Sequence, residues 1–254
     1  MASRRSASRP GAGDARAAKL RHARDPIMTR FFRDRGLALG LVVLVMLLVA
    51  VSQGGLAYTV LVGELKGLLS QWPMQLSRLQ WGLRACMLLG MMLLWVVKKK
   101  RALFRVIVIA NVYFTMVLLV DTAVLLMVLG RLTVRAVGNL IFDVLAIAAS
   151  NILIFSIWYW VIDPPGVVDG EPEGQPWAFL FPQRACVLPS YQGWVPGYAD
   201  YLFLAFTTSF AFSPTDTPPL TRSAKMLMLL QAIISVVTVT GIAASAINIL
   251  SSRG

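Results

Sequence analysis

The sequence has very few of the side chains on which most catalytic and metal sites depend. His22 is the single histidine among 254 residues, and it lies in the basic N-terminal segment. The two cysteines are Cys86, in an apolar run, and Cys186, in a polar loop, and they do not have the spacing of metal ligands. The sequence therefore argues against a histidine-based triad or a multi-histidine metal site. We expect no enzyme, no cofactor and no bound metal.

Charged residues are also scarce. They make up 14% of the chain against about 25% in ordinary soluble domains, while 57% of the residues are hydrophobic. A helix needs about 20 apolar residues to cross a bilayer, so this chain has room for five or six membrane segments. The composition predicts an all-α protein, a polytopic bundle of transmembrane helices whose main partner is the lipid bilayer.

The positive charge is concentrated beside the apolar runs. Of the 24 Lys and Arg residues, ten lie in residues 1–36 and five in residues 98–105. Basic residues that flank membrane segments stay in the cytoplasm, so this pattern predicts a cytoplasmic N-terminus and no binding of nucleic acid. Two interpretations of residues 1–36 stay open: a tail held at anionic lipid, or a disordered tail that only sets the topology.

The pattern of apolar and polar residues divides the chain into four regions. Residues 1–36 form the basic tail, and residues 37–162 contain four apolar segments that we expect to be transmembrane helices. Residues 163–197 form a polar loop rich in Pro and Gly, long enough to be a candidate functional loop. Residues 198–250 form a helix-turn-helix module whose first apolar piece, Tyr198 to Pro214, has only about 17 residues, the lower limit for a crossing.

Polar residues inside the apolar segments are the first candidates for a functional site, because they are costly in a membrane. One interpretation is a lane for ions or protons, and the other is hydrogen bonding between helices, which we favour because no Lys or Arg is available inside the membrane as a partner. Small residues in the last segment predict close packing against a helix or another subunit. The polar residues are Asn111, Asp121, Asp143 and Asn151, and the small ones include Gly241 and Ser245.

The stretch from Asp200 to Leu230 contains a short aromatic segment ending in Phe206, Thr207 and Thr208, followed by Asp216, prolines and a long apolar run. It resembles the pore segment of the potassium-channel superfamily, which implies a helix, loop and inner-helix layout. Phe212 stands where that family has valine, and the family's Gly-Tyr-Gly is replaced here. Because proline cannot take a positive φ, we do not expect a potassium-selective carbonyl cage. The replacing residues are Ser213, Pro214 and Thr215.

The same stretch is more closely similar to an uncharacterised family of multi-spanning bacterial membrane proteins. That resemblance implies a fold relative and a bacterial plasma membrane location, and it assigns no activity. The alternative interpretation of Thr207 to Asp216 is a plain helix followed by an Asx-type turn, with Thr207 and Thr208 bonded to carbonyls of their own helix. The residues that carry the similarity are Ala205, Phe206, Thr207, Phe212, Thr215, Asp216, Thr217, Thr221, Arg222, Leu229 and Leu230.

Two predictions of topology conflict. Six crossings with the N-terminus inside place 17 of the 24 basic residues in the cytoplasm. A channel-like arrangement, in which Tyr198 to Pro214 is a re-entrant helix that enters from outside, leaves only 6 there. The charge rule uses the whole chain, so we expect the segment from Tyr198 to Pro214 to cross the membrane.

These patterns favour a channel-like permeation protein for an ion or small solute, with a homo-oligomer and a monovalent cation as the expected partners. The alternative is a non-conducting scaffold or sensor that binds lipid or a partner protein through its basic tail and long loop. Membrane-embedded catalysis would need acids that converge, and Asp121, Asp143 and Asp216 are the candidates.

Overall fold

The structure is a computed structural model, and it describes residues 40–53, 72–97, 99–129, 137–163, 177–186, 188–191, 194–212 and 216–251. The chain divides into two units, Met1–Leu39 and Gly40–Gly254, and only parts of the second are described. The predictions made for the basic tail and for Ser213, Pro214 and Thr215 lie outside the described residues. Ser245 lies within a described helix, but its side chain does not belong to the described part.

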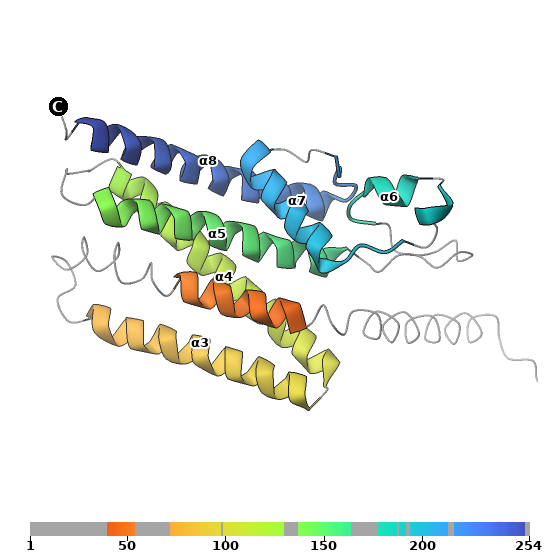
Figure 1. Ribbon diagram of the computed structural model, residues 1–254. Helices are drawn as coiled ribbons and strands as arrows, with labels where there is room; N and C mark the ends of the chain where they lie inside the picture. Colours follow the sequence, from red (N-terminus) through yellow and green to blue (C-terminus); the bar gives the residue numbers. More distant parts are fainter. Residues whose placement is uncertain are drawn as a thin grey trace, which may run out of the picture. The chain divides into compact units, whose positions relative to one another are not determined.

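The described residues form helices and no strand, which confirms the prediction of an all-helical protein. One helix covers Gly40–Gln53. Figure 1 labels the main helices along the remaining chain. These elements are α3 (Trp72–Val96), α4 (Lys100–Leu129), α5 (Val137–Ile162), α6 (Pro182–Ala185), the 3₁₀ turn η2 (Pro189–Tyr191), α7 (Tyr198–Ala211) and α8 (Arg222–Ser251).

Three of the described helices contain segments long and apolar enough to cross a bilayer: Ala102–Leu126, Phe142–Ile162 and Arg222–Ala243. The helix Gly40–Gln53 and the segment Trp81–Val96 of α3 are apolar but shorter. This fits a membrane protein.

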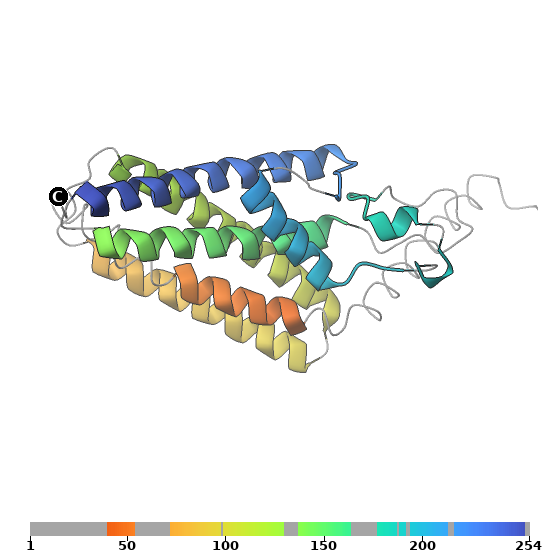
Figure 2. The same cartoon turned by 45° about the horizontal axis from the view of Figure 1, so that its top comes forward.

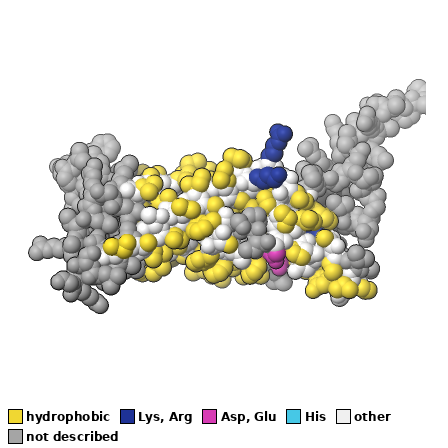
Figure 3. All heavy atoms as spheres, turned by 90° about the horizontal axis from the view of Figure 1, so that it is seen from above, with side chains coloured by type: hydrophobic (Ala, Val, Ile, Leu, Met, Phe, Trp, Pro, Cys, Tyr) yellow, Lys and Arg dark blue, Asp and Glu magenta, His cyan; other side chains and the backbone are white. Residues whose placement is uncertain are grey.

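Apolar side chains cover the outside of the helices, and polar ones lie inside. Leu89, Phe142 and Met226 expose 67%, 65% and 63% of their surface, whereas Asn151 and Gln231 expose 1% and 0%. Figure 3 shows hydrophobic side chains over much of the described surface on the face that it presents. This distribution is the reverse of that in a water-soluble bundle, and it suits helices that are surrounded by lipid.

Helix α5 lies at the centre of the packing and contacts α4, α7 and α8, while α3 packs on α4. Helices α5 and α8 run side by side, as Figures 1 and 2 both show. They are antiparallel, because the Tyr159 hydroxyl donates to the Gln231 side chain and Asn151 Nδ2 donates to Ser235 Oγ at 2.9 Å. The shorter α7 is inclined to both of these long helices in the two views.

Candidate functional site

Helix α7 begins at the end of the bundle where α5 ends. Near its start, the hydroxyls of Tyr198 and Ser156 are hydrogen-bonded at 2.6 Å. One turn later, the Tyr201 hydroxyl donates to Oδ2 of Asp163, also at 2.6 Å. Asp163 directly follows α5, whose last residue is Ile162. The N-terminal turn of α7 is therefore fixed to the C-terminal end of α5.

The chain returns to this same end after α7. The Leu180 amide donates to the Pro218 carbonyl at 3.1 Å, and the Leu220 amide donates to the Ala178 carbonyl at 2.8 Å. The Ala178 amide in turn donates to Asp163 Oδ1 at 2.8 Å. The segments that precede and follow α7 consequently meet beside Asp163, and α8 starts from there.

Between these two points, α7 penetrates partway along the bundle. Gln231 Nε2 donates to the Ala205 carbonyl and to Ser209 Oγ, both at 2.8 Å. Gln231 is nine residues beyond Arg222, the first residue of α8, which places the end of α7 about 14 Å along α8 at 1.5 Å per residue. The apolar core of a bilayer is about 30 Å thick. Helix α7 therefore ends partway along α8 and does not reach its far end.

The segment from Tyr198 to Pro214 was expected to cross the membrane, and in the structure its described helix does not run the length of α5. Its helix has only 14 residues, about 21 Å in length, and its flanks are held at one end of α5. The hydrogen bonds between residues 178–180 and 218–220 exclude a path in which residues 198–220 run from one end of α5 to the other.

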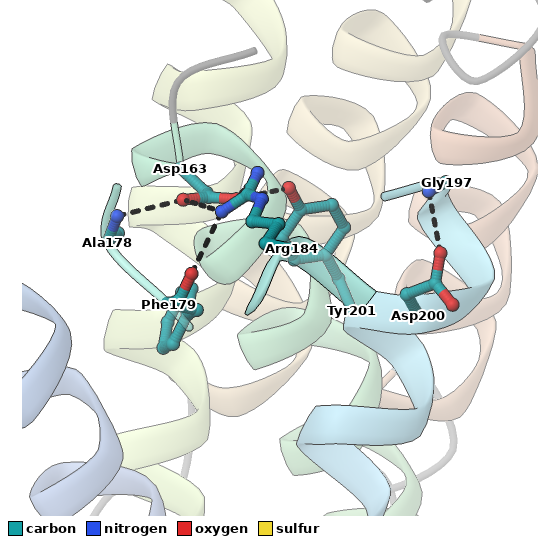
Figure 4. Close-up of polar contacts among 7 residues, drawn as sticks. All are labelled: Asp163, Ala178, Phe179, Arg184, Gly197, Asp200 and Tyr201. Atoms are coloured by element: carbon teal, nitrogen blue, oxygen red, sulfur yellow. Dashed lines mark hydrogen bonds and ion pairs between the residues drawn. The ribbon is translucent and has the colours of Figure 1, made fainter. Parts of the chain in front are cut away.

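A buried ion pair anchors the long loop to this site (Figure 4). Arg184 Nη2 lies 2.9 Å from Asp163 Oδ2, and the two side chains are 2% and 0% exposed. Arg184 Nη1 also donates to Oδ1 of Asp163 at 3.3 Å and to the Phe179 carbonyl at 2.8 Å. The Arg184 guanidinium lies over the Trp177 ring at 4.8 Å from its centroid. All of these bonds hold residues 177–186 against the end of α5.

Asp200 has a different and local role, which Figure 4 also shows. Its Oδ2 accepts a hydrogen bond from the Gly197 amide at 2.7 Å, which is the half of a capping box that the third residue of a helix supplies. The cap satisfies one of the amides that a helix leaves unpaired at its N-terminus.

The residues matched to the potassium-channel pore segment lie on α7 and just beyond it. Thr207 Oγ1 donates to the Phe203 carbonyl at 3.0 Å, and Thr208 Oγ1 donates to the Leu204 carbonyl at 2.7 Å. Both threonines thus bond within their own helix, as the alternative interpretation expects. Phe206 is 50% exposed on the outer face.

The turn after α7 begins with an uncommon backbone conformation. Phe212 is the C-terminal cap of α7 and has a φ of 54°, in the left-handed region that a side chain rarely occupies. Beyond the turn, Thr217 Oγ1 donates to Asp216 Oδ1 at 3.2 Å. This sharp end allows the chain to leave the helix and return.

Two of the predicted polar residues form hydrogen bonds between helices. Asn111 of α4 donates from Nδ2 to the Ile154 carbonyl of α5 at 3.3 Å. Asn151 of α5 donates to Ser235 of α8. Gly241 is buried where α8 meets the other helices, and a Cβ there would lie 3.3 Å from Val144 Cγ2 and 3.4 Å from Leu125 Cδ2.

The prediction that no basic residue is available to the intramembrane acids is wrong. Arg84 is 1% exposed at the middle of α3. The sequence interpretation began the second apolar segment at Leu83, which put Arg84 at its edge. Because α3 begins at Trp72, Arg84 lies twelve residues inside the helix.

The three acids proposed for catalysis do not converge. Asp216 lies on the return segment close to Pro218, which is bonded at the C-terminal end of α5. Asp143 is six residues after the first residue of α5, toward the opposite end. A site that uses Asp121, Asp143 and Asp216 together is therefore not present.

The sequence interpretation also missed the roles of Asp163, Arg184 and Gln231. Gln231 is the one amide or charged side chain between Lys225 and Asn248, which was a usable signal of a buried polar contact. Asp163 and Arg184 lie 21 residues apart, and no spacing rule connects them.

Comparison of the chain with protein-family models, with curated proteins and with solved structures gave no match.

Proposed function

We propose that this protein is an integral membrane permeation protein, in which α5, α7 and α8 form a channel-like module for a monovalent cation. The observation that carries the proposal is the course of the chain at α7: the helix enters the bundle, and the segments before and after it meet at the end of α5. Short helices that end inside a membrane are suited to ion sites, because their unpaired backbone groups meet the ion.

The direction of α7 favours a cation. The last carbonyls of a helix have no partner within the helix, and they give its C-terminus about half a negative charge. In α7 this end lies near Ser209 and Gln231, partway along α8, and the last turn contains no basic residue. A cation at this depth would be stabilised, and an anion would be repelled.

The outer face of α7 supports an oligomer. Non-helical backbone at membrane depth is tolerated only when protein covers it or when it lines a water-filled cavity. Phe212, at the end of α7, has non-helical backbone, and the helix face beside it exposes large aromatic side chains. A second copy of the chain would cover both. The exposed residues are Phe203, Phe206, Phe210 and Phe212, which are between 42% and 59% exposed.

When α7 is a re-entrant helix that enters from the cytoplasmic side, the positive-inside rule and the resemblance to a channel pore segment no longer predict opposite topologies. Five crossings, at residues 37–62 and at α3, α4, α5 and α8, then place the loop and the start of α8 inside the cell. Arg184, Arg222 and Lys225 join the basic residues of 1–36 and 98–105, so 18 of 24 are cytoplasmic. This is a stronger positive-inside bias than that of the six-crossing arrangement.

The test is to reconstitute the purified full chain into liposomes and planar bilayers and to measure K⁺, Na⁺ and Cl⁻ flux. We expect cation flux that exceeds Cl⁻ flux, and a mass in detergent of more than one chain. Phe210→Lys, which puts a positive charge at the end of α7, should reduce cation flux about tenfold or more, since about 1.4 kcal/mol of added repulsion corresponds to a factor of ten. Phe210→Met is the matched control and should conduct like the parent.

Absence of conductance under every ionic condition, or a strictly monomeric mass, would overturn the proposal and favour the non-conducting scaffold or sensor. Equal flux in Phe210→Lys and Phe210→Met would contradict the assignment of the cation path to α7.

A further inference from the structure

An apolar groove lies between the helix Gly40–Gln53 and α3. The two helices run side by side, as Figures 1 and 2 both show. The groove has a volume of about 550 Å³, and its lining is almost entirely apolar. We call it the α3 groove. Its lining includes Gly40, Leu44 and Leu47 of the first helix and Ala85, Met92 and Trp95 of α3.

The α3 groove runs lengthwise between two antiparallel helices. Gly40, the first described residue of its helix, lies beside Trp95 near the end of α3, because a Cβ at Gly40 would be 3.8 Å from Trp95 Nε1. From Trp95 back to Ala85 the groove extends along ten residues, about 15 Å at 1.5 Å per residue. With α3 across the membrane, as in the five crossings proposed above, this is half of the apolar core of about 30 Å. The groove therefore has the direction and the depth of one lipid leaflet.

One end of the α3 groove opens at a basic segment. Four consecutive basic residues, 98–101, follow α3, and residues 98–105 contain five basic residues and no acid. The side chains of Lys99 and Arg105 are exposed, and those of the other three lie outside the described residues. The Lys99 amide donates to the Leu94 carbonyl at 3.1 Å, so the backbone of this segment is held at the last turn of α3, next to Trp95.

Trp95 marks the level of the lipid headgroups at this end of the groove. Its side chain is 51% exposed and lines the groove. Indole rings of membrane proteins are enriched where the apolar core meets the headgroups. Basic residues that border a membrane segment attract anionic headgroups. A lipid at this end consequently meets apolar lining on one side of Trp95 and positive charge on the other.

Charge and shape favour a phospholipid over a second copy of the chain as the occupant. The side chains of Leu44, Leu89 and Met92 line the groove and are exposed, so an acyl chain can enter from the side. A second copy inserted with the same orientation would bring its own residues 98–101 to the same end, and juxtaposed like charges oppose such a contact. An uncharged lipid would not use the positive charge of this segment.

We propose that the α3 groove is a binding site for one anionic phospholipid, with an acyl chain in the groove and the headgroup phosphate at residues 98–101. The acyl chain contacts two helices at once, and van der Waals packing is the main attraction between apolar groups inside a membrane. The phosphate adds an electrostatic attraction, so this lipid is retained when the surrounding lipids exchange. The site uses the five crossings proposed above, and it does not depend on the cation path of α5, α7 and α8.

Native mass spectrometry of the purified full chain in a mild detergent, titrated with phosphatidylglycerol or phosphatidylcholine, tests the proposal. The parent protein should retain one phosphatidylglycerol per chain and bind it about fivefold or more tighter than phosphatidylcholine, the factor expected for one basic residue near a headgroup. Ala85→Phe puts a ring in the groove and should weaken phosphatidylglycerol binding about fivefold or more, because the acyl chain loses packing contacts. Cys86→Phe is the matched control, since Cys86 is exposed on α3 and is not among the described lining residues, and it should bind like the parent.

The role of the basic segment is tested by the same titration. Lys99→Gln should weaken phosphatidylglycerol binding about fivefold, because one attractive charge near the headgroup is lost. Lys225→Gln removes an exposed charge at the start of α8, which contributes none of the described lining residues, and it should leave the binding unchanged.

Equal binding of the two lipids by the parent protein, or tighter binding of an uncharged lipid, would overturn the proposal, and this comparison does not depend on the folding of any variant. Equal effects of Ala85→Phe and Cys86→Phe would also overturn it. A loss of dimer in Ala85→Phe, with no loss of lipid, would show that a second copy of the chain occupies the groove. Ion flux enters none of these outcomes, so failure of the lipid site and failure of the cation path are distinguishable.

Discussion

Asp163 and Arg184 form a buried ion pair, at 2.9 Å, that connects the end of α5 to the loop that leads into α7. The same carboxylate also accepts the Tyr201 hydroxyl of α7 and the Ala178 amide of the loop. One side chain thus fixes three segments at a single point. The position of α7 depends on this point, because the segment that follows α7 is paired with residues 178–180.

Arg184→Met should lower the free energy of unfolding by about 3–5 kcal/mol, the usual cost of leaving a buried charge without its partner. The loss can be measured by unfolding in mixed micelles. Labelling of Cys186 with maleimide should become faster in this variant, because the loop that contains it is released.

The matched control is Arg222→Met, at the exposed start of α8, which should change the free energy of unfolding by no more than about 0.5 kcal/mol. The double variant Asp163→Asn with Arg184→Met should lose less than the sum of the two single losses, since no charge is then left uncompensated. Equal losses for Arg184→Met and Arg222→Met would show that the pair does not hold the loop.

The sequence was sufficient to predict the all-helical fold, because long apolar runs without internal proline have few alternatives. It was also sufficient to show that the apolar segment from Tyr198 is at the lower limit of length for a membrane crossing. It did not establish whether that segment crosses the membrane. The length of the segment and the distribution of basic residues predict a crossing only together with the topology of the whole chain. The contacts between residues 178–180 and 218–220, which bring the two flanks of α7 together, are not revealed by any local pattern.

The candidate polar residues were only partly interpretable from the sequence. Asn111 and Asn151 were marked as polar groups inside apolar segments, and in the structure they have hydrogen-bond partners on neighbouring helices. Arg84 was missed because the start of α3 was placed at the first purely apolar residues. Trp, Pro and Gln near Trp72 are typical of an interface, yet here they begin the helix and move Arg84 to its centre.

Gln231→Met should destabilise the protein by about 1–3 kcal/mol and loosen α7. Gln231 donates to the Ala205 carbonyl and to Ser209 Oγ, and it accepts from the Tyr159 hydroxyl. Methionine has a similar shape and cannot form these bonds, so buried polar groups on two helices lose a partner. Thermal unfolding in detergent measures the effect. Ile233→Met is the control, because the Ile233 side chain on α8 is 53% exposed. An equal loss of stability in this variant would refute a specific role of the Gln231 amide.

Cysteines at Ser190 and Thr221 should both react with a membrane-impermeant maleimide from the same side of the membrane. The two residues flank α7 on the chain, and the bonds between residues 178–180 and 218–220 hold both flanks at one end of α5. The experiment uses a background in which Cys86 and Cys186 are replaced by serine. Ser251→Cys, at the far end of α8, serves as the control and should react from the opposite side. Labelling of Ser190→Cys and Thr221→Cys from different sides would show that α7 crosses.

Gly241→Leu should lower the free energy of unfolding by about 1–3 kcal/mol, the usual cost of overpacking a close helix contact. A Cβ at Gly241 would lie 3.3 Å from Val144 Cγ2, and the rest of a leucine side chain would force α8 away from α5. Gly90→Leu is the matched control, because a Cβ there meets nothing within 4 Å, and it should cost nothing measurable. The loss should be smaller in a Val144→Ala background, where the added atoms find room, and the double-mutant cycle measures this coupling. An equal cost of Gly241→Leu in both backgrounds would show that the contact with Val144 is not what requires glycine.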